Sequence, residues 1–202
     1  MNTNQTIRKY VRSTPRGKPF STTKFLGLGK RAAVDQAISR LVKAGEITRI
    51  ARGIFVRPEK NKYLGTVMPD PTTIAKLIAQ DTGSIIQIHG AEAIYRLSLT
   101  TQAPTQLIFY TSGSNRNFQL GSLHITLKHV SQRKLLLAGQ PAGVAFTALW
   151  YLGKQQVTIK TLETIQRKLS ISEFKALQSI IPSMPGWMGD LFTEFNKSQN
   201  RA

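Results

Sequence analysis

The fold is decided by residues 30–56, which read KRAAVDQAISRLVKAGEITRIARGIFV. In the first half, apolar side chains recur with the spacing of one helix face, which predicts a helix over residues 30–44. Gly45 directly follows and is suited to end that helix. In the second half, two runs rich in β-branched residues, 46–50 and 53–56, flank a turn centred on Arg52, and this pattern predicts a β-hairpin.

Two shorter helical patterns precede this stretch. Residues 5–13 place apolar side chains on one face, and Ser21 is a suitable N-cap for a helix that runs to Leu26. Residues 27–29, Gly-Leu-Gly, are typical of a tight turn. The order helix, helix, glycine turn, helix and hairpin is that of a winged helix-turn-helix, which places its second helix in the major groove of DNA.

The chain changes character at residues 58–71, which are rich in Lys, Gly and Pro. We take this segment as the boundary between a winged helix-turn-helix domain over residues 1–62 and a mixed α/β domain over residues 67–202. The fold class is therefore α+β, with a helical C-terminal part. The second domain is expected to hold helices over 72–81 and 91–97, strands over 84–89, 106–111, 118–120 and 123–129, and tail helices over 143–152, 159–169, 172–181 and 187–196.

The positive charge is concentrated near the N-terminus. The 202 residues include 28 Lys and Arg and 10 Asp and Glu, a formal net charge of +18. Residues 1–62 carry 15 basic and 3 acidic residues, a net charge of +12, whereas residues 63–202 carry 13 and 7, a net charge of +6. Such a distribution favours a polyanion-binding module in the first 62 residues over a generic positive surface.

The expected DNA-contacting residues lie on the long helix, in the hairpin and in the basic connector before them. The helix face opposite the core can meet base edges, where Gln36 suits adenine, although a solvated polar face is the alternative for Gln36 and Ser39. The hairpin turn can reach a neighbouring backbone or a narrow minor groove. The candidates are Lys30, Arg31, Gln36, Ser39, Arg40 and Lys43 on the helix, Arg49 and Arg52, with Arg57, in the hairpin, and Arg16 and Lys18 in the connector.

Two stretches resemble a known family. Residues 38–56, with RLVKAGEI at the helix end and RGIF in the hairpin, closely resemble the winged-helix domain of AbiEi-type antitoxins of type IV toxin–antitoxin and abortive phage-infection systems. The runs HGAEA at 89–93, LSLTTQAP at 97–104 and TSG at 111–113 resemble the subset of that group long known as a domain of unknown function. Tyr95 and Ser98 stand where Asn and Gly are commoner in that subset.

The resemblance, which covers roughly residues 5–135, implies a two-domain antitoxin. Its winged helix would repress its own operon by binding repeats in the promoter DNA. Its second domain would counter a nucleotidyltransferase-like toxin, generally without a stable complex. A homodimer on paired half-sites is left open. A stand-alone winged-helix regulator without a toxin, and a nucleic-acid enzyme positioned by its winged helix, are the alternatives.

The second half offers little for catalysis, so we expect a binding protein with no catalytic residue, metal or cofactor. His89 and Glu92 could form an acid–base pair, but a histidine that caps the following helix is the better interpretation. His124 and His129 are five residues apart on one predicted strand and therefore face opposite sides. The absence of cysteine excludes disulfides, thiolate catalysis and Cys-based zinc sites.

The sequence also bears on location. The first ten residues are polar and lack the apolar run of a secretory signal. No stretch approaches the ~20 apolar residues of a membrane span. The cytoplasm is therefore the expected compartment, and no membrane partner is expected.

Overall fold

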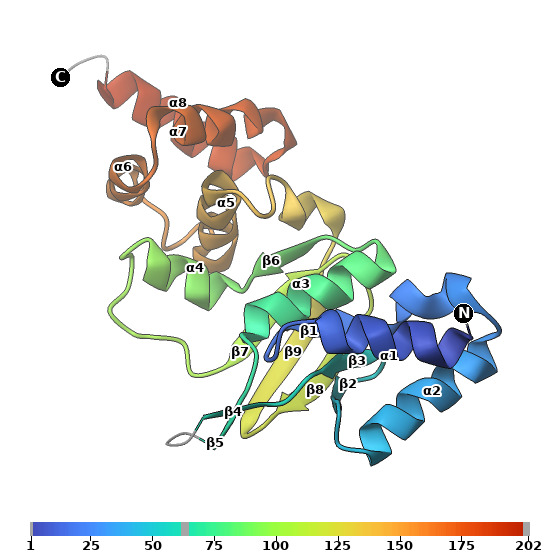
Figure 1. The fold of residues 1–202 in the computed structure, drawn as a ribbon. Helices are drawn as coiled ribbons and strands as arrows, with labels where there is room; N and C mark the ends of the chain where they lie inside the picture. Colours follow the sequence, from blue (N-terminus) through green and yellow to red (C-terminus); the bar gives the residue numbers. More distant parts are fainter. Residues whose placement is uncertain (1, 62–64, 200–202) are drawn as a thin grey trace. The chain divides into compact units, whose positions relative to one another are not determined.

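The computed structural model describes residues 2–61 and 65–199 and has a mixed α+β fold (Figure 1). Contacts between backbone segments divide the chain into two compact units. Unit 1 comprises Met1–Ser84 and Arg116–Thr126, and unit 2 comprises Ile85–Asn115 and Leu127–Ala202.

Unit 1 begins with two α-helices separated by a 3₁₀ helix. Helix α1 (Thr3–Ser13) and helix α2 (Arg31–Lys43) confirm the helices predicted over residues 5–13 and 30–44. The predicted helix from Ser21 is instead a 3₁₀ helix, η1 (Thr22–Leu28), although Ser21 does cap it by accepting a hydrogen bond from the Thr23 N–H at 3.1 Å. Thr22 and Thr23 are β-branched and Gly27 is flexible, and these residue types have low α-helix propensity.

The predicted hairpin is the core of a three-stranded antiparallel sheet. Strands β2 (Thr48–Ala51) and β3 (Ile54–Val56) are joined by the two-residue turn Arg52–Gly53, in which Gly53 has a φ of 79°. Strand β1 (Pro19–Ser21) pairs with the other edge of β3, giving the order β1-β3-β2. The sequence did not predict β1, because three residues beginning with Pro carry too little periodicity. The Thr22 N–H donates to the Gly53 carbonyl at 3.0 Å, so η1 holds the turn.

One apolar cluster joins the helices of unit 1 to this sheet. Tyr10 packs edge-to-face against Phe20 and Phe25, with ring centroids 6.0 and 5.1 Å away. Because the apolar face of α2 is buried here, its polar face is left exposed. The buried members are Ile7, Val11, Phe20, Phe25, Val34, Ala37, Ile38, Leu41, Ile47 and Phe55.

The rest of unit 1 comes from two distant parts of the sequence. Strands β4 (Glu59–Asn61) and β5 (Gly65–Val67) form an antiparallel pair, and helix α3 (Pro71–Thr82) follows. Strand β8 (Arg116–Leu120) packs beside β2, and strand β9 (Leu123–His129) starts in unit 1 and ends in unit 2. The predicted boundary between residues 62 and 67 includes residues 62–64, which lie outside the described residues. The two compact units divide the chain at other positions.

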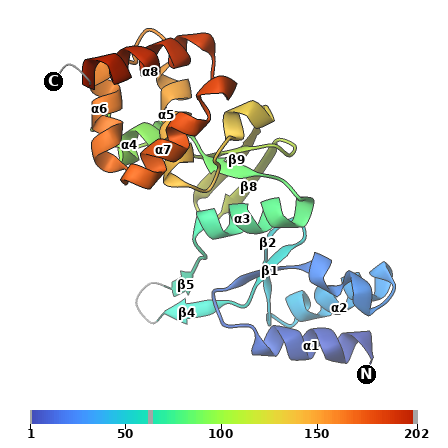
Figure 2. The same cartoon turned by 90° about the horizontal axis from the view of Figure 1, so that it is seen from above.

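Unit 2 consists of the remaining strands and a helical tail (Figure 2). The four-stranded sheet has the order β6-β7-β9-β8, with β9 shared between the units. The helices and strands predicted here are confirmed to within three residues. They are β6 (Ile86–Ile88), α4 (Gly90–Arg96), β7 (Leu107–Thr111), α5 (Pro141–Leu152), α6 (Ile159–Lys168), α7 (Ile171–Ser179) and α8 (Gly186–Gln199). Unit 2 also contains two short 3₁₀ helices that the sequence did not predict, η2 (Gln132–Leu135) and η3 (Ile181–Ser183).

The end of α4 carries a strained residue that gives a stability prediction. Ser98 is exposed and has a φ of 56°, and its N–H donates to the Tyr95 carbonyl at 2.9 Å. This left-handed position after a helix favours glycine. We expect Ser98→Gly to raise the free energy of unfolding by about 0.5–1 kcal/mol, measured by urea denaturation. Ser172→Gly, inside α7, should lower it by about 0.5 kcal/mol, and a loss of stability in Ser98→Gly would contradict the strain argument.

Candidate nucleic-acid interface

A basic groove of about 470 Å³ lies between α2 and the β2–β3 hairpin; we call it the α2–hairpin groove. Its lining includes Arg31 and Lys43 from α2, and Arg49 and Arg52 from the hairpin. Asp35, whose carboxylate lies 3.6 Å from the Arg31 Nε, is the one acidic side chain among the described lining residues. Four cations around one carboxylate leave the groove positive, which suits an anionic ligand.

The spacing along α2 sets where these groups lie. Arg31 is the first and Lys43 the last residue of the helix, so the rise of 1.5 Å per residue separates them by about 18 Å along its axis. Ser39 lies four residues before Lys43 and is therefore on the same exposed face. That length is roughly half a turn of duplex DNA, so one helix can follow a groove of the duplex across several base pairs.

The hairpin contributes two exposed arginines to the groove. Arg52 is exposed, and among the described residues no ion pair or hydrogen bond holds its guanidinium. Arg49 is also exposed, and its Nε donates weakly to the Ala51 carbonyl at 3.4 Å. Both arginines are therefore available to a ligand that enters the groove.

The structure brings together five of the eleven predicted site residues. Arg31, Ser39, Lys43, Arg49 and Arg52 line the α2–hairpin groove. Five others are exposed but do not line it: Lys30 is the N-cap of α2, and Gln36 and Arg40 lie on that helix. Arg16 and Lys18 lie between α1 and β1, where Arg16 Nη1 donates to the Pro58 carbonyl at 3.4 Å.

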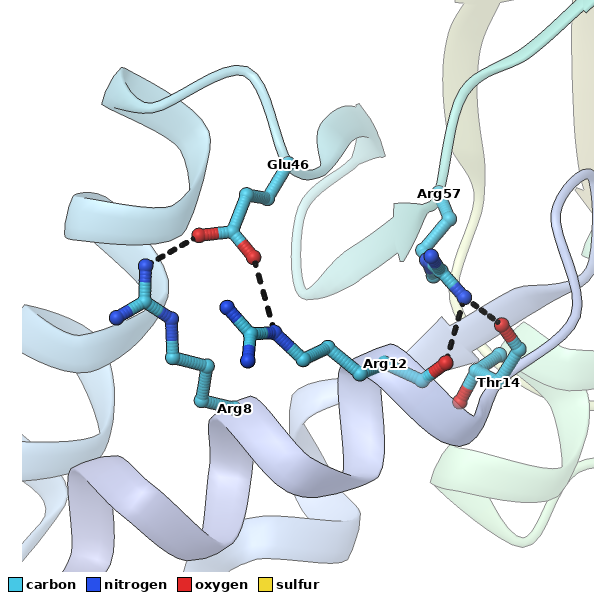
Figure 3. Close-up of polar contacts among 5 residues, drawn as sticks. All are labelled: Arg8, Arg12, Thr14, Glu46 and Arg57. Carbon is cyan, nitrogen blue, oxygen red and sulfur yellow. Dashed lines mark hydrogen bonds and ion pairs between the residues drawn. The ribbon is translucent and has the colours of Figure 1, made fainter.

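The placement of Arg57 with the hairpin turn was wrong. Arg57 follows β3, and its Nη1 donates to the carbonyls of Arg12 and Thr14, both at 2.7 Å (Figure 3). Carbonyls at the end of a helix have no partner within it, and a charged donor there satisfies them. Arg57 therefore stabilises the end of α1 and does not face the groove.

Two other arginines near the N-terminus, Arg8 and Arg12, also form contacts within the protein. Arg8 Nη2 lies 2.6 Å and Arg12 Nε 3.9 Å from the carboxylate of Glu46, as Figure 3 shows. The hydrogen bond from Arg8, with the nearby charges of Arg8, Arg12 and Arg57, lowers the pKa of Glu46 against a smaller opposing effect of burial. These arginines tie α1 to the segment that follows α2.

Strand β8 adds a basic residue that the sequence did not predict for this interface. Arg116 begins β8, is exposed, and belongs to unit 1 although it lies 60 residues beyond Val56, the end of the hairpin. Nothing near Arg116 in the sequence indicates this position, since only the pairing of distant segments brings β8 beside β2.

Comparison with models of known protein families shows which family this chain belongs to. A family model described as a family of unknown function (DUF6088) matches residues 6–177. The chain belongs to the DUF6088 family. No curated protein sequence matches it.

The histidines of the DUF6088 protein have identifiable surroundings. His89 is the N-cap of α4, and its Nδ1 accepts a hydrogen bond from the Ala91 N–H at 3.2 Å, as the helix-cap interpretation predicts. Partial burial, and to a smaller extent the charge of Lys128, lowers the pKa of His89. Glu92 pairs instead with Arg96 at 2.6 Å.

The described part of the chain shows neither a metal-binding cluster nor a membrane-spanning helix. Within residues 2–61 and 65–199, no group of three or more His, Asp or Glu side chains is placed to hold a metal ion. None of the helices described there combines the length and apolar character needed to cross a membrane.

The Glu46 ion pairs predict a pH dependence. A carboxylate whose folded pKa is lowered stabilises the fold above its unfolded value, and that contribution is lost as the pH falls through the folded pKa. We expect Glu46→Gln to be less stable than wild type at neutral pH and to lose less stability below pH 4.5, the ordinary value for Glu. Thermal unfolding as a function of pH measures this. Parallel curves for the two proteins would rule the coupling out, and Glu163→Gln in unit 2 is the control.

Proposed function

We propose that this protein is a DNA-binding regulator whose unit 1 works as a winged helix-turn-helix. In this proposal α2 is the recognition helix and the β2–β3 hairpin is the wing. The observation that supports it best is the α2–hairpin groove, where two separate elements direct four basic side chains to one surface. A positive groove bounded by an exposed helix face suits the phosphates of a duplex and its base edges.

Each part of this surface has its own role in the proposal. Arg31, Lys43, Arg49 and Arg52 contact phosphates, because their charges line the groove. Gln36, Ser39 and Arg40, exposed on α2, contact base edges. Lys30 at the helix start, and Arg16 and Lys18 in the connector, add phosphate contacts beside the groove.

The salt dependence of DNA binding tests this function. If the full chain makes ~6 phosphate contacts, its affinity for duplex DNA falls about three orders of magnitude between roughly 50 and 200 mM salt. Fluorescence anisotropy of a labelled duplex measures this. An affinity that does not change with salt, or no binding at low salt, would contradict the proposal.

We further propose that the protein is the antitoxin of a type IV-like pair, which counters a nucleotidyltransferase-like toxin and represses its own promoter from the cytoplasm. The resemblance of residues 38–56 and 89–113 to AbiEi-type antitoxins supports this. The test is co-expression of the full chain with the product of the neighbouring gene. Growth should be restored by wild type and also by Arg31→Ala/Arg52→Ala, because unit 2 carries the neutralising role.

If co-expression does not restore growth, the antitoxin role is tested separately from the DNA-binding role. If a toxic neighbour is not countered while DNA binding is retained, the protein is a stand-alone regulator. Such a result would remove the antitoxin role and leave the DNA-binding proposal in place.

A further inference from the structure

A second basic groove adjoins the first within unit 1. It has a volume of about 540 Å³, and Arg31 and Arg52, together with Thr22 and Gly53, line both grooves. Its other wall includes Arg116 and Asn117 from β8. We call it the β8 groove. It brings a third arginine to the same basic surface from a part of the chain far away in the sequence.

Arg116 is available for a ligand. Its side chain is exposed, and within the described residues no ion pair or hydrogen bond engages its guanidinium. The one carboxylate among the lining residues, Asp81, accepts a hydrogen bond from the Thr23 hydroxyl at 2.8 Å, which also fixes η1 against α3. Three guanidinium groups around one carboxylate leave the β8 groove positive.

The chemistry of the lining favours phosphate. Guanidinium groups present paired N–H donors that match two phosphate oxygens, and three of them line this groove. The β8 groove shares Arg31, Arg52, Thr22 and Gly53 with the α2–hairpin groove, so an extended anion can contact both grooves whereas a compact ligand would occupy one. The phosphodiester backbone of nucleic acid has that form and spacing of charge.

We propose that the β8 groove binds the backbone phosphates of the DNA strand that passes the hairpin, with Arg116 as the phosphate-contacting residue specific to this groove. This inference rests on the proposed DNA-binding function and extends its surface to β8. Arg31 and Arg52 line both grooves, so the contacts to the DNA strand run continuously from α2 to β8.

The test compares salt slopes for the full chain with a labelled mixed-sequence duplex of about 30 base pairs. Removing one phosphate contact should lower the slope of log affinity against log salt by about 0.9 and weaken binding about eightfold in ~0.1 M salt. We expect this for Arg116→Ala, and we expect Arg116→Lys to keep the wild-type slope. Arg167→Ala, which removes the same charge from an exposed position on α6, should leave slope and affinity unchanged.

Two outcomes would overturn the inference. If Arg116→Ala matches Arg167→Ala while Arg31→Ala and Arg52→Ala weaken binding, the β8 groove is not part of the interface and the proposed function stands. If wild type does not bind the duplex at all, the proposed function fails and the inference fails with it.

A second readout distinguishes DNA from free phosphate. The NMR signal of the Arg116 Nε–H group should shift on addition of the duplex. A shift with inorganic phosphate and none with the duplex would overturn the assignment to DNA. Circular dichroism of Arg116→Ala should match wild type, since the side chain is exposed.

Discussion

Replacing Arg31 and Arg52 together with alanine should weaken duplex binding about 60-fold in ~0.1 M salt, since each lost phosphate contact removes the release of about one counterion. Arg31 and Arg52 are the two basic residues that line both grooves. The loss of Arg31 also leaves Asp35 without its ion pair at the edge of the groove, where a free carboxylate repels phosphate. Fluorescence anisotropy over a series of salt concentrations measures the affinity and its slope, and the slope should fall by about 1.8.

A matched charge control makes this result specific. Arg167→Ala/Lys175→Ala removes the same two charges from α6 and α7 of unit 2. If the control weakens binding as much as the groove variant, the effect belongs to net charge and the groove has no special role. The expected result is a control that stays within about twofold of wild type, since neither Arg167 nor Lys175 lines the α2–hairpin groove or the β8 groove.

The largest expected effect on stability is that of Gly143→Ala. Gly143 is buried in α5, and a Cβ added there would overlap the backbone carbonyl of Leu137, a residue with a φ of 57°. It would also lie 2.9 Å from the buried Gln87 Nε2. Backbone cannot move aside as a flexible side chain can. Although alanine ordinarily stabilises a helix, we expect a loss of ~3 kcal/mol or more and a drop in melting temperature of roughly 6–12 °C.

A second helical glycine provides the control for that prediction. At Gly189 in α8, the added Cβ would lie 3.7 Å from Ile181 Cγ2, which is ordinary van der Waals contact. Gly189→Ala should therefore raise the free energy of unfolding by up to about 1 kcal/mol. Scanning calorimetry measures the melting temperature of both variants. A Gly143→Ala variant more stable than wild type would contradict the prediction and show that the Leu137 backbone moves aside for the added Cβ.

Local patterns predicted most of the secondary structure. The apolar spacing that buries Val34, Ile38 and Leu41 predicted α2, and the glycine after Arg52 predicted the hairpin turn. The sequence also predicted two helix caps, since Ser21 and His89 both accept hydrogen bonds from backbone amides at helix starts. These features depend on residues close together in the chain, which a sequence displays directly.

Features that depend on distant pairing were not predicted. Strand β1 exists because β3 lies beside it, more than 30 residues later in the chain. Arg57 was expected beside the turn, but unpaired carbonyls at the end of α1 engage it. Arg116 belongs to the basic surface of unit 1 only because β8 packs against β2. The positions of basic residues in a sequence do not show which arginines form contacts within the protein and which remain free to contact a ligand.

The hydrogen bond from Thr22 to the Gly53 carbonyl has a consequence for the rate and free-energy cost of the proposed DNA binding. The Arg52–Gly53 turn is closed by sheet pairing on one side and held by η1 on the other. Its backbone is therefore ordered before any ligand arrives, and binding need immobilise only the Arg52 side chain. Ordering one rotamer-rich side chain costs about 0.5–1.5 kcal/mol, whereas each backbone residue of a loose loop would cost roughly a further 1–2 kcal/mol. Association can then proceed by rigid docking, with a rate set by diffusion and electrostatic attraction and not by a loop that must first find its shape.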